Sequence, residues 1–244
     1  MKRISTFLML ALPLMLAVGV LASFKHITEE WVKGNGIVKE ESRDASAFTD
    51  ISTSGVYKVV ITQGNNHSIR VAAEENLLPY ILTEIRGGEL RIYSKKGYNI
   101  QPTRGITVYV TMQQVEKLSA SGASGFSNTG TLNSDRIQLD FSGAADADLN
   151  INTKKLAVGL SGASNIKLKG SSDKAEYGIS GAADIKALDL SSDDVSVDIS
   201  GTGKAQVFAQ KKLAASISGM GSIKYKGDPG VTKSISGMGR ISKI

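Results

Sequence analysis

The sequence predicts an all-β protein whose main part is a parallel β-helix-like solenoid, with coils of about 19 residues and a more irregular β-rich N-terminal part. The first observation is a Ser-Gly pair that recurs seven times, with serine-to-serine steps of 21, 19, 19, 20, 18 and 18 residues. The second is the alternation of apolar and polar residues on both sides of each pair, which is the period of a half-buried strand. The third is that the second half of the chain, which contains these pairs, has no apolar stripe with a helical period. A fixed period of this length is typical of stacked repeats, and the repeating serines are Ser121, Ser142, Ser161, Ser180, Ser200, Ser218 and Ser236.

The first expected element is a signal peptide over residues 1–22. Lys2 and Arg3 precede an apolar run that ends at Ala22, and this order fits the charged and apolar regions of a secretory signal. An uncleaved N-terminal anchor is the alternative, although the run is shorter than the about 20 apolar residues of a membrane span. We therefore expect an exported bacterial protein, periplasmic, at the cell surface or extracellular, with no membrane span after cleavage.

The next expected elements are a linker and a single domain. Residues 23–47 are polar and mixed in charge, which favours a linker. Residues 48–241 form the domain, with an irregular β part over 48–118 and the Ser-Gly repeats over 119–241. The irregular part has two interpretations: it forms the first, decorated coils of the solenoid, or it caps the open apolar end.

Each Ser-Gly pair is expected to form a corner between two short strands. A glycine allows a positive φ at a sharp turn, and a serine hydroxyl satisfies nearby backbone groups. The alternative is a ladder of hydroxyls that faces a ligand. The expected corner glycines are Gly122, Gly143, Gly162, Gly181, Gly201, Gly219 and Gly237.

Charge is concentrated at the C-terminal end of the chain. The formal net charge is +6, but residues 201–244 contain eight lysine and arginine residues against Asp228 alone, a net charge of +7. Such an end suits an anionic glycan or lipid head groups, and the alternative is that lysines prevent rods from stacking end to end. Nucleic acid is not expected as a partner, because the protein is exported and this segment has little aromatic interleaving.

Few residues are available for chemistry. The chain has no cysteine, which excludes disulfides, thiol nucleophiles and cysteine metal sites. Its two histidines, His26 and His67, form neither a metal motif nor part of a Ser-His-Asp set. We therefore expect no metal, no cofactor and no catalytic residues.

A polysaccharide-acting lyase or hydrolase would need carboxylates that converge across neighbouring coils. Asp146 and Asp184 share one position of the repeat but are expected two coils apart. Asp140 and Asp198 share another and are expected three coils apart. Neither pair predicts a close catalytic dyad, so we interpret all four as solvated outer residues.

Several blocks resemble a known bacterial family. They are Val59–Gly64, Ala73–Tyr80, the Ser-Gly-Ala-Ser repeats, Lys224–Pro229 and Ser236–Gly239. In this combination the chain resembles, over residues 44–241, the putative auto-transporter adhesin, head GIN domain family, formerly a domain of unknown function and common in Bacteroidetes. The resemblance implies a right-handed β-helix-like fold, an exported location and an adhesin-like role, and it supplies no catalytic residues.

These observations favour an exported, non-enzymatic β-helix that binds a glycan or another cell-envelope component along an outer face. The alternatives are a polysaccharide-acting lyase or hydrolase and a structural envelope protein. The oligomeric state is left open by the sequence. The candidate ligand-binding residues are Tyr93, Tyr98, Arg104, Lys224 and Lys226.

Overall fold

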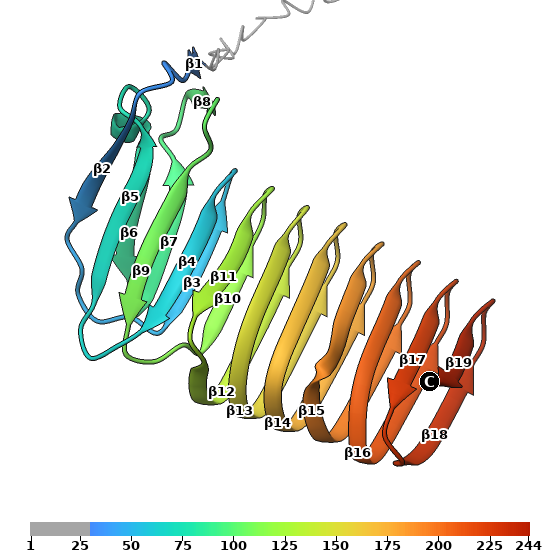
Figure 1. Cartoon of the computed structure of the whole chain (residues 1–244). Helices are drawn as coiled ribbons and strands as arrows, with labels where there is room; N and C mark the ends of the chain where they lie inside the picture. The colour runs from blue at the N-terminus through green and yellow to red at the C-terminus, as the bar shows by residue number, and fades with distance from the viewer. Residues whose placement is uncertain (1–29) are drawn as a thin grey trace, which may run out of the picture.

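The computed structural model describes residues 30–244, and over them the protein is an elongated β-solenoid (Figure 1). Strands make up 67% of it and helix 1%, and about seven turns follow one another at a spacing of about 19 residues. The predicted fold class is therefore confirmed. The signal peptide expected over residues 1–22 lies outside the described residues.

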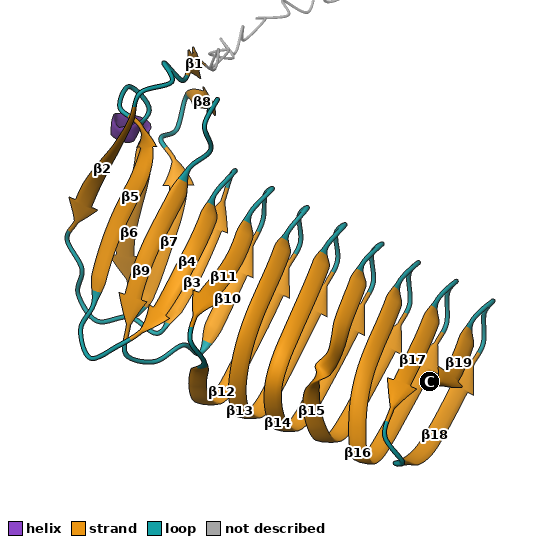
Figure 2. Cartoon of the chain, viewed as in Figure 1, coloured by secondary structure: helices purple, strands orange, loops and turns teal. Residues whose placement is uncertain are grey.

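Each coil of the solenoid consists of two arms. We call the stretch after a Ser-Gly pair the leading arm and the stretch before the next pair the trailing arm. A single bent strand, such as β13 (Asp146–Leu160) or β14 (Asn165–Ile179), runs through both arms of its coil. The Ser-Gly corners are the loops that gather along one side of the stack (Figure 2). The other solenoid strands are β10 (Lys117–Ala120), β11 (Gly125–Thr129), β12 (Leu132–Phe141), β15 (Asp184–Ile199), β16 (Lys204–Ile217), β17 (Ser222–Lys226), β18 (Gly230–Ile235) and β19 (Arg240–Lys243).

Neighbouring coils pair in parallel, with equivalent residues of the repeat side by side. Asp146 pairs with Asn165, and the register continues without a break to Leu160 and Ile179. The next pairing, between β14 and β15, shifts after Lys167, where the longer coil takes up one extra residue. This irregularity explains why the serine step is 20 rather than 19 at this point of the sequence.

The N-terminal part contains both a decorated start of the solenoid and a cap, so both interpretations of the sequence apply. The parallel strands β3, β4, β7 and β9 continue the stack beyond the first repeat. The strands β2, β5 and β6 add antiparallel pairs, and the short helix η1 lies among them. The bounds are β2 (Val38–Arg43), β3 (Asp50–Ser54), β4 (Lys58–Gln63), β5 (Ser68–Glu74), η1 (Leu78–Tyr80), β6 (Ile81–Arg86), β7 (Glu89–Ser94) and β9 (Thr107–Met112).

Part of the expected linker is folded. Within residues 30–47, β1 (Glu30–Lys33) pairs with β8 (Tyr98–Gln101), and β2 pairs with β5. The polar sequence of β2 favours a linker, but the residues form a strand that is nearly all exposed. They are polar because β2 is an edge strand, where charged side chains discourage pairing with another chain.

The interior is a continuous column of apolar side chains between the two arms. Their alternation with outward polar residues follows the burial of each strand, as in β14. Phe126 and Phe141 stack in this column with ring centroids 5.5 Å apart. Among the few polar groups inside, the hydroxyls of Ser172 and Ser192, in adjacent coils, pair with each other at 2.7 Å.

The corner glycines are required by close approach rather than by a positive φ, which corrects the expectation from sequence. None of the seven is among the glycines with positive φ. A Cβ atom on any of them would stand 2.0–2.3 Å from the carbonyl oxygen of the corner glycine one coil earlier. For Gly122 that earlier glycine is Gly55, so Ser54-Gly55 is an eighth corner that the repeat spacing did not reveal.

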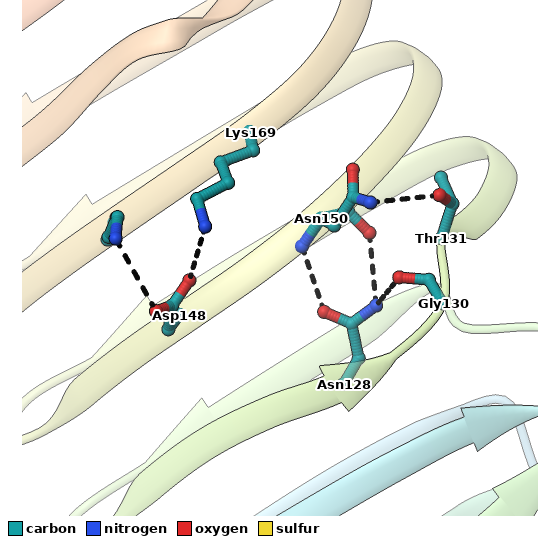
Figure 3. Close-up of polar contacts among 7 residues, drawn as sticks. Asn128, Gly130, Thr131, Asp148, Asn150 and Lys169 are labelled. Atoms are coloured by element: carbon teal, nitrogen blue, oxygen red, sulfur yellow. Dashed lines mark hydrogen bonds and ion pairs between the residues drawn. The ribbon is translucent and has the colours of Figure 1, made fainter.

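An asparagine pair bridges the break between β11 and β12 (Figure 3). The Asn128 amide nitrogen donates to the carbonyl oxygens of Gly130 at 2.9 Å and Asn150 at 3.1 Å, and its oxygen accepts from the Asn150 backbone nitrogen at 2.9 Å. The Asn150 side chain in turn donates to the Thr131 hydroxyl at 3.0 Å. The Asn128 side chain thus replaces the strand hydrogen bonds lost where the chain turns at Gly130, which has a φ of 73°.

Candidate functional site

A groove runs along the outer face of the trailing arms, beside the Ser-Gly corners. Its volume is about 830 Å³. It crosses successive strands from β3 to β16, so at about 4.8 Å between strands it is roughly 30 Å long. We call it the serine groove, because corner serines line one side of it. They are Ser121, Ser142, Ser161, Ser180, Ser200 and Ser218.

The groove exists because one outward position of every trailing arm carries a small or short side chain. This position lies two residues before each corner serine, and strand pairing stacks its members into one column. At the centre Gly159 and Gly178 have no side chain at all. The column contains Ser52, Ser119, Asp140, Gly159, Gly178, Asp198 and Ser216.

The corner serines hold the coils together and still offer their hydroxyls to a ligand. The Ser142 backbone nitrogen donates to the Ala120 carbonyl oxygen at 2.9 Å, and its hydroxyl makes a longer contact with the same oxygen at 3.3 Å. Ser180 repeats this arrangement on Leu160, at 2.9 and 3.3 Å. A hydroxyl bond of this length is weak, and both lone pairs of the serine oxygen remain available as acceptors.

Two carboxylates flank the bare centre of the groove. Asp140 accepts a hydrogen bond from Gln138 at 2.7 Å and an ion pair from Lys117 at 3.0 Å. Asp198 is exposed and has no ion pair among residues 30–244. Gly159 and Gly178 pair with each other and lie between the two aspartates. They leave a shallow notch with backbone at its floor and a carboxylate, Asp140 or Asp198, at each end.

The carboxylates do not form a glycosidase pair. Asp140 and Asp198 are three strand spacings apart, roughly 14 Å, whereas the two carboxyl groups of glycoside hydrolases lie about 5–9.5 Å apart. Asp146 and Asp184 are separated by Asn165, whose amide donates to Asp146 at 3.1 Å. The outward aspartates therefore lie as far apart as the repeat spacing predicts.

Tyr93 is the only predicted ligand residue beside the serine groove. It lies in β7, paired in register with Ser54, one strand beyond the first corner. Its hydroxyl donates to a Glu84 carboxylate oxygen at 3.2 Å. Partial burial, followed by the charge and hydrogen bond of Glu84, raises the pKa of Tyr93, so the hydroxyl stays protonated as a donor.

The other predicted ligand residues lie elsewhere. Tyr98 is in β8, where its ring packs against Tyr80 with centroids 4.5 Å apart. Arg104 is exposed in a loop whose backbone is held by the Glu74 carboxylate, through the amides of Thr103 at 2.8 Å and Arg104 at 3.4 Å. The structure therefore does not bring these residues into one site with Tyr93.

Lys224 and Lys226 are exposed on β17, on a leading arm of the last coils. The Lys226 ammonium lies 4.8 Å from the centroid of the Phe208 ring in the adjacent strand. The leading and trailing arms face opposite sides of the solenoid, so these lysines form a surface separate from the serine groove.

Sequence reasoning used the column before the corner serines only to test for a catalytic pair. The signal for a groove was present in the same residues, because every member of that column is small or acidic. A narrow column becomes a hollow only when its neighbours on both sides are larger, and that depends on how the coils stack.

Neither a membrane-spanning helix nor a metal site is found in the part of the chain that the structure describes. No helix within residues 30–244 is long and apolar enough to cross a bilayer. The same residues contain no group of three or more histidine, cysteine, aspartate or glutamate side chains that could hold a metal ion.

The fold is an elongated β-solenoid with a long groove on one side. A sequence profile of the family described as "putative auto-transporter adhesin, head GIN domain" matches residues 47–229. The chain therefore belongs to this family, which confirms the resemblance seen in the sequence. No functionally curated protein shows significant similarity to the chain.

Solved structures of similar fold include proteins from Bacteroides and Parabacteroides species. A putative adhesin from Bacteroides fragilis has a TM-score of 0.83 at 22% identity and covers 87% of this chain and 100% of its own. A putative lipid binding protein from Parabacteroides distasonis has a TM-score of 0.72 at 27% identity, with 88% and 100% covered. A putative adhesin from Parabacteroides merdae has a TM-score of 0.70 at 24% identity, with 88% and 99% covered.

Proposed function

We propose that the protein is an exported, non-enzymatic binding protein that holds an extended polysaccharide of the cell envelope or cell surface in its serine groove. The observation that carries this proposal is the length and chemistry of the groove. Hydroxyl and carboxylate oxygens recur along it at the strand spacing of about 4.8 Å, close to the length of one sugar unit in an extended chain. A repeating ligand can therefore meet the same contacts in successive coils.

The groove offers the kinds of contact that sugars use. Corner serines and the two flanking aspartates accept hydrogen bonds from sugar hydroxyls. The notch at Gly159 and Gly178 lets a ring approach the backbone closely. Tyr93 would add an aromatic surface at the N-terminal end of the groove, next to Ser54.

Family membership and the separation of the carboxylates support binding rather than catalysis. The family is described as an adhesin domain, and structures of similar fold are described in the same way. An exported or surface location fits that description. Within the groove, Asp140 and Asp198 are too far apart for the two-carboxylate hydrolysis of glycosides.

The test is a glycan array followed by calorimetric titration of the best extended polysaccharide. Gly178→Phe fills the notch, since a Cβ at Gly178 has only the Val158 carbonyl oxygen near it, at 3.8 Å. Lys167→Phe is the matched control, because Lys167 is exposed on the same strand but on the leading arm. We expect Gly178→Phe to weaken binding about tenfold or more and Lys167→Phe to leave it unchanged. Equal effects of the two variants, or no bound polysaccharide at all, would refute the proposal.

A further inference from the structure

The last coils carry a basic surface on their leading arms. Outward positions of three adjacent strands, β16, β17 and β19, place four cations together. Among these outward positions there is no carboxylate, and none of the four cations makes an ion pair within residues 30–244. They are Lys204, Lys224, Lys226 and Arg240, and we call them the basic face.

Exposed apolar side chains lie in the same coils as the basic face. Met220 and Met238 occupy consecutive Ser-Gly corners and are 53% and 77% exposed. In the corners from Gly122 to Gly201 this position is alanine or threonine, as at Ala182 and Thr202. Ile235, at the end of β18, is 46% exposed because no further coil in the described chain covers it.

Two lysines stand at positions that are apolar in the preceding coil. Lys233 pairs with Ala215, and Lys243 pairs with Tyr225, and both partners point into the buried interior. The Lys233 ammonium reaches the Ile241 carbonyl oxygen at 3.4 Å, and Lys243 reaches Asp228 at 3.0 Å. Stacking a second copy on this end would bury these ammonium groups and bring two strongly basic surfaces together, so a second copy is a poor occupant.

We infer that this end of the solenoid docks on the surface of an anionic phospholipid bilayer. The charge is complementary, since residues 201–244 carry a net charge of +7. The exposed Met220, Ile235 and Met238 suit the boundary between head groups and acyl chains, where basic residues surround inserted apolar ones. An acidic polysaccharide fits less well, because the ring of Phe208 is covered by Lys226 and the other aromatic ring of this end, Tyr225, is buried.

Docking by this end leaves the serine groove free, because the groove lies on the trailing arms. The inference therefore does not depend on the polysaccharide proposed above. In this arrangement the trailing-arm side of the solenoid stays exposed to other ligands.

The test is co-sedimentation of the full chain with phosphatidylcholine vesicles and with equimolar phosphatidylcholine and phosphatidylglycerol vesicles. We expect binding to the anionic vesicles only, and loss of binding at high salt. Lys224→Glu with Arg240→Glu is expected to weaken binding about tenfold or more, and Met238→Ser to weaken it by a smaller factor. The matched control is Lys58→Glu with Lys96→Glu, which makes the same change in charge at exposed lysines in the N-terminal part of the chain, away from the basic face.

Circular dichroism of each variant shows whether it is folded, and light scattering reports self-association. The inference is overturned if the wild type does not bind anionic vesicles, or if the control variant loses binding as strongly as the basic-face variant. It is also overturned if the basic-face substitutions abolish dimerisation or binding to an acidic polysaccharide but leave vesicle binding unchanged. Loss of vesicle binding with retained polysaccharide binding at the serine groove would separate this inference from the proposed function.

Discussion

The backbone carbonyl oxygen of Gly143 lies 2.0 Å from the position that a Cβ atom on Gly162 would occupy. Two coils therefore meet backbone to backbone at the corner, and the same contact recurs at each Ser-Gly pair. The serine beside each glycine also binds the preceding coil through its backbone nitrogen, so two contacts hold neighbouring coils together at each corner.

Replacing Gly162 with alanine is expected to destabilise the protein by about 1–3 kcal/mol, because two packed backbones must separate to admit the methyl group. Chemical denaturation followed by circular dichroism measures the change. Gly178→Ala is the control. Gly178 lies within β14 and, like Gly162, does not have a positive φ, but its Cβ would meet only the Val158 carbonyl oxygen, at 3.8 Å. Similar losses in the two variants would show that glycine content, rather than close approach, determines stability.

Glu74 is expected to make stability depend on pH. The Thr103 hydroxyl, at 2.6 Å, is the main cause of a lowered pKa for this carboxyl, and burial opposes it while backbone amides of Thr103, Gly36 and Arg104 lower it further. Because the pKa of Glu74 is lowered in the folded protein, its ionised carboxylate stabilises the fold fully above pH 4.5, the ordinary pKa of a glutamate. This stabilisation is lost as the pH falls through the lower pKa that Glu74 has in the folded protein. Glu74→Gln should therefore be less stable than the wild type at neutral pH, and the difference should shrink in acid.

Denaturation at a series of pH values measures this difference for Glu74→Gln. Glu40→Gln is the control, since Glu40 pairs with Arg70 at a half-exposed site and surface pairs contribute little. A difference between Glu74→Gln and the wild type that stays constant from neutral pH into acid would contradict the role of the ionised carboxylate.

Two buried tyrosines are expected to respond differently to loss of the hydroxyl group. The Tyr57 hydroxyl lies 2.8 Å from the Ser94 hydroxyl, so Tyr57→Phe should cost about 1 kcal/mol and leave Ser94 without its partner. Tyr177 is 2% exposed, and burial alone raises its pKa, with no hydrogen bond contributing. Tyr177→Phe should therefore be neutral or stabilising. Thermal unfolding of the two variants decides between this result and an equal loss at both positions.

The Asn128 side chain is expected to act through both its donor and its acceptor. Asn128→Ala should cost about 1–3 kcal/mol, because it leaves backbone groups of Asn150 and Gly130 without partners. Asn128→Asp keeps the shape but sets a charge against two carbonyl oxygens, so it should be at least as unstable at neutral pH and recover in acid. An aspartate variant as stable as the wild type at neutral pH would contradict this account.

The solenoid could be predicted from the sequence because each coil is specified locally. The alternation around Leu156 and Ile166 determines which side chains face inward, and the serine step determines where the chain turns. The reason for the corner glycine could not be predicted, because the clash involves a residue one coil away. Gly55 was missed for a related cause: it precedes Gly122 by 67 residues, since the cap strands intervene.

The cap and the groove depend on contacts between distant parts of the chain. Val38 pairs with Glu74, and no periodic pattern links two such segments. The column that forms the serine groove is visible in the sequence only as small residues two positions before each serine. Its hollow depends on the larger side chains around it, and its relation to Tyr93 depends on the pairing of β3 with β7.

The unbroken register between β13 and β14 makes one coil an exchangeable unit of length. Residues 146–164 align residue by residue with the coil that follows. The pairing that runs from Asp146 with Asn165 to Leu160 with Ile179 has no bulge. Duplicating this cassette would lengthen the rod by one strand spacing, about 4.8 Å, and add one serine and one outward small residue to the groove. The reach of the protein is therefore a countable quantity that gene duplication or design can change one coil at a time, without altering either end.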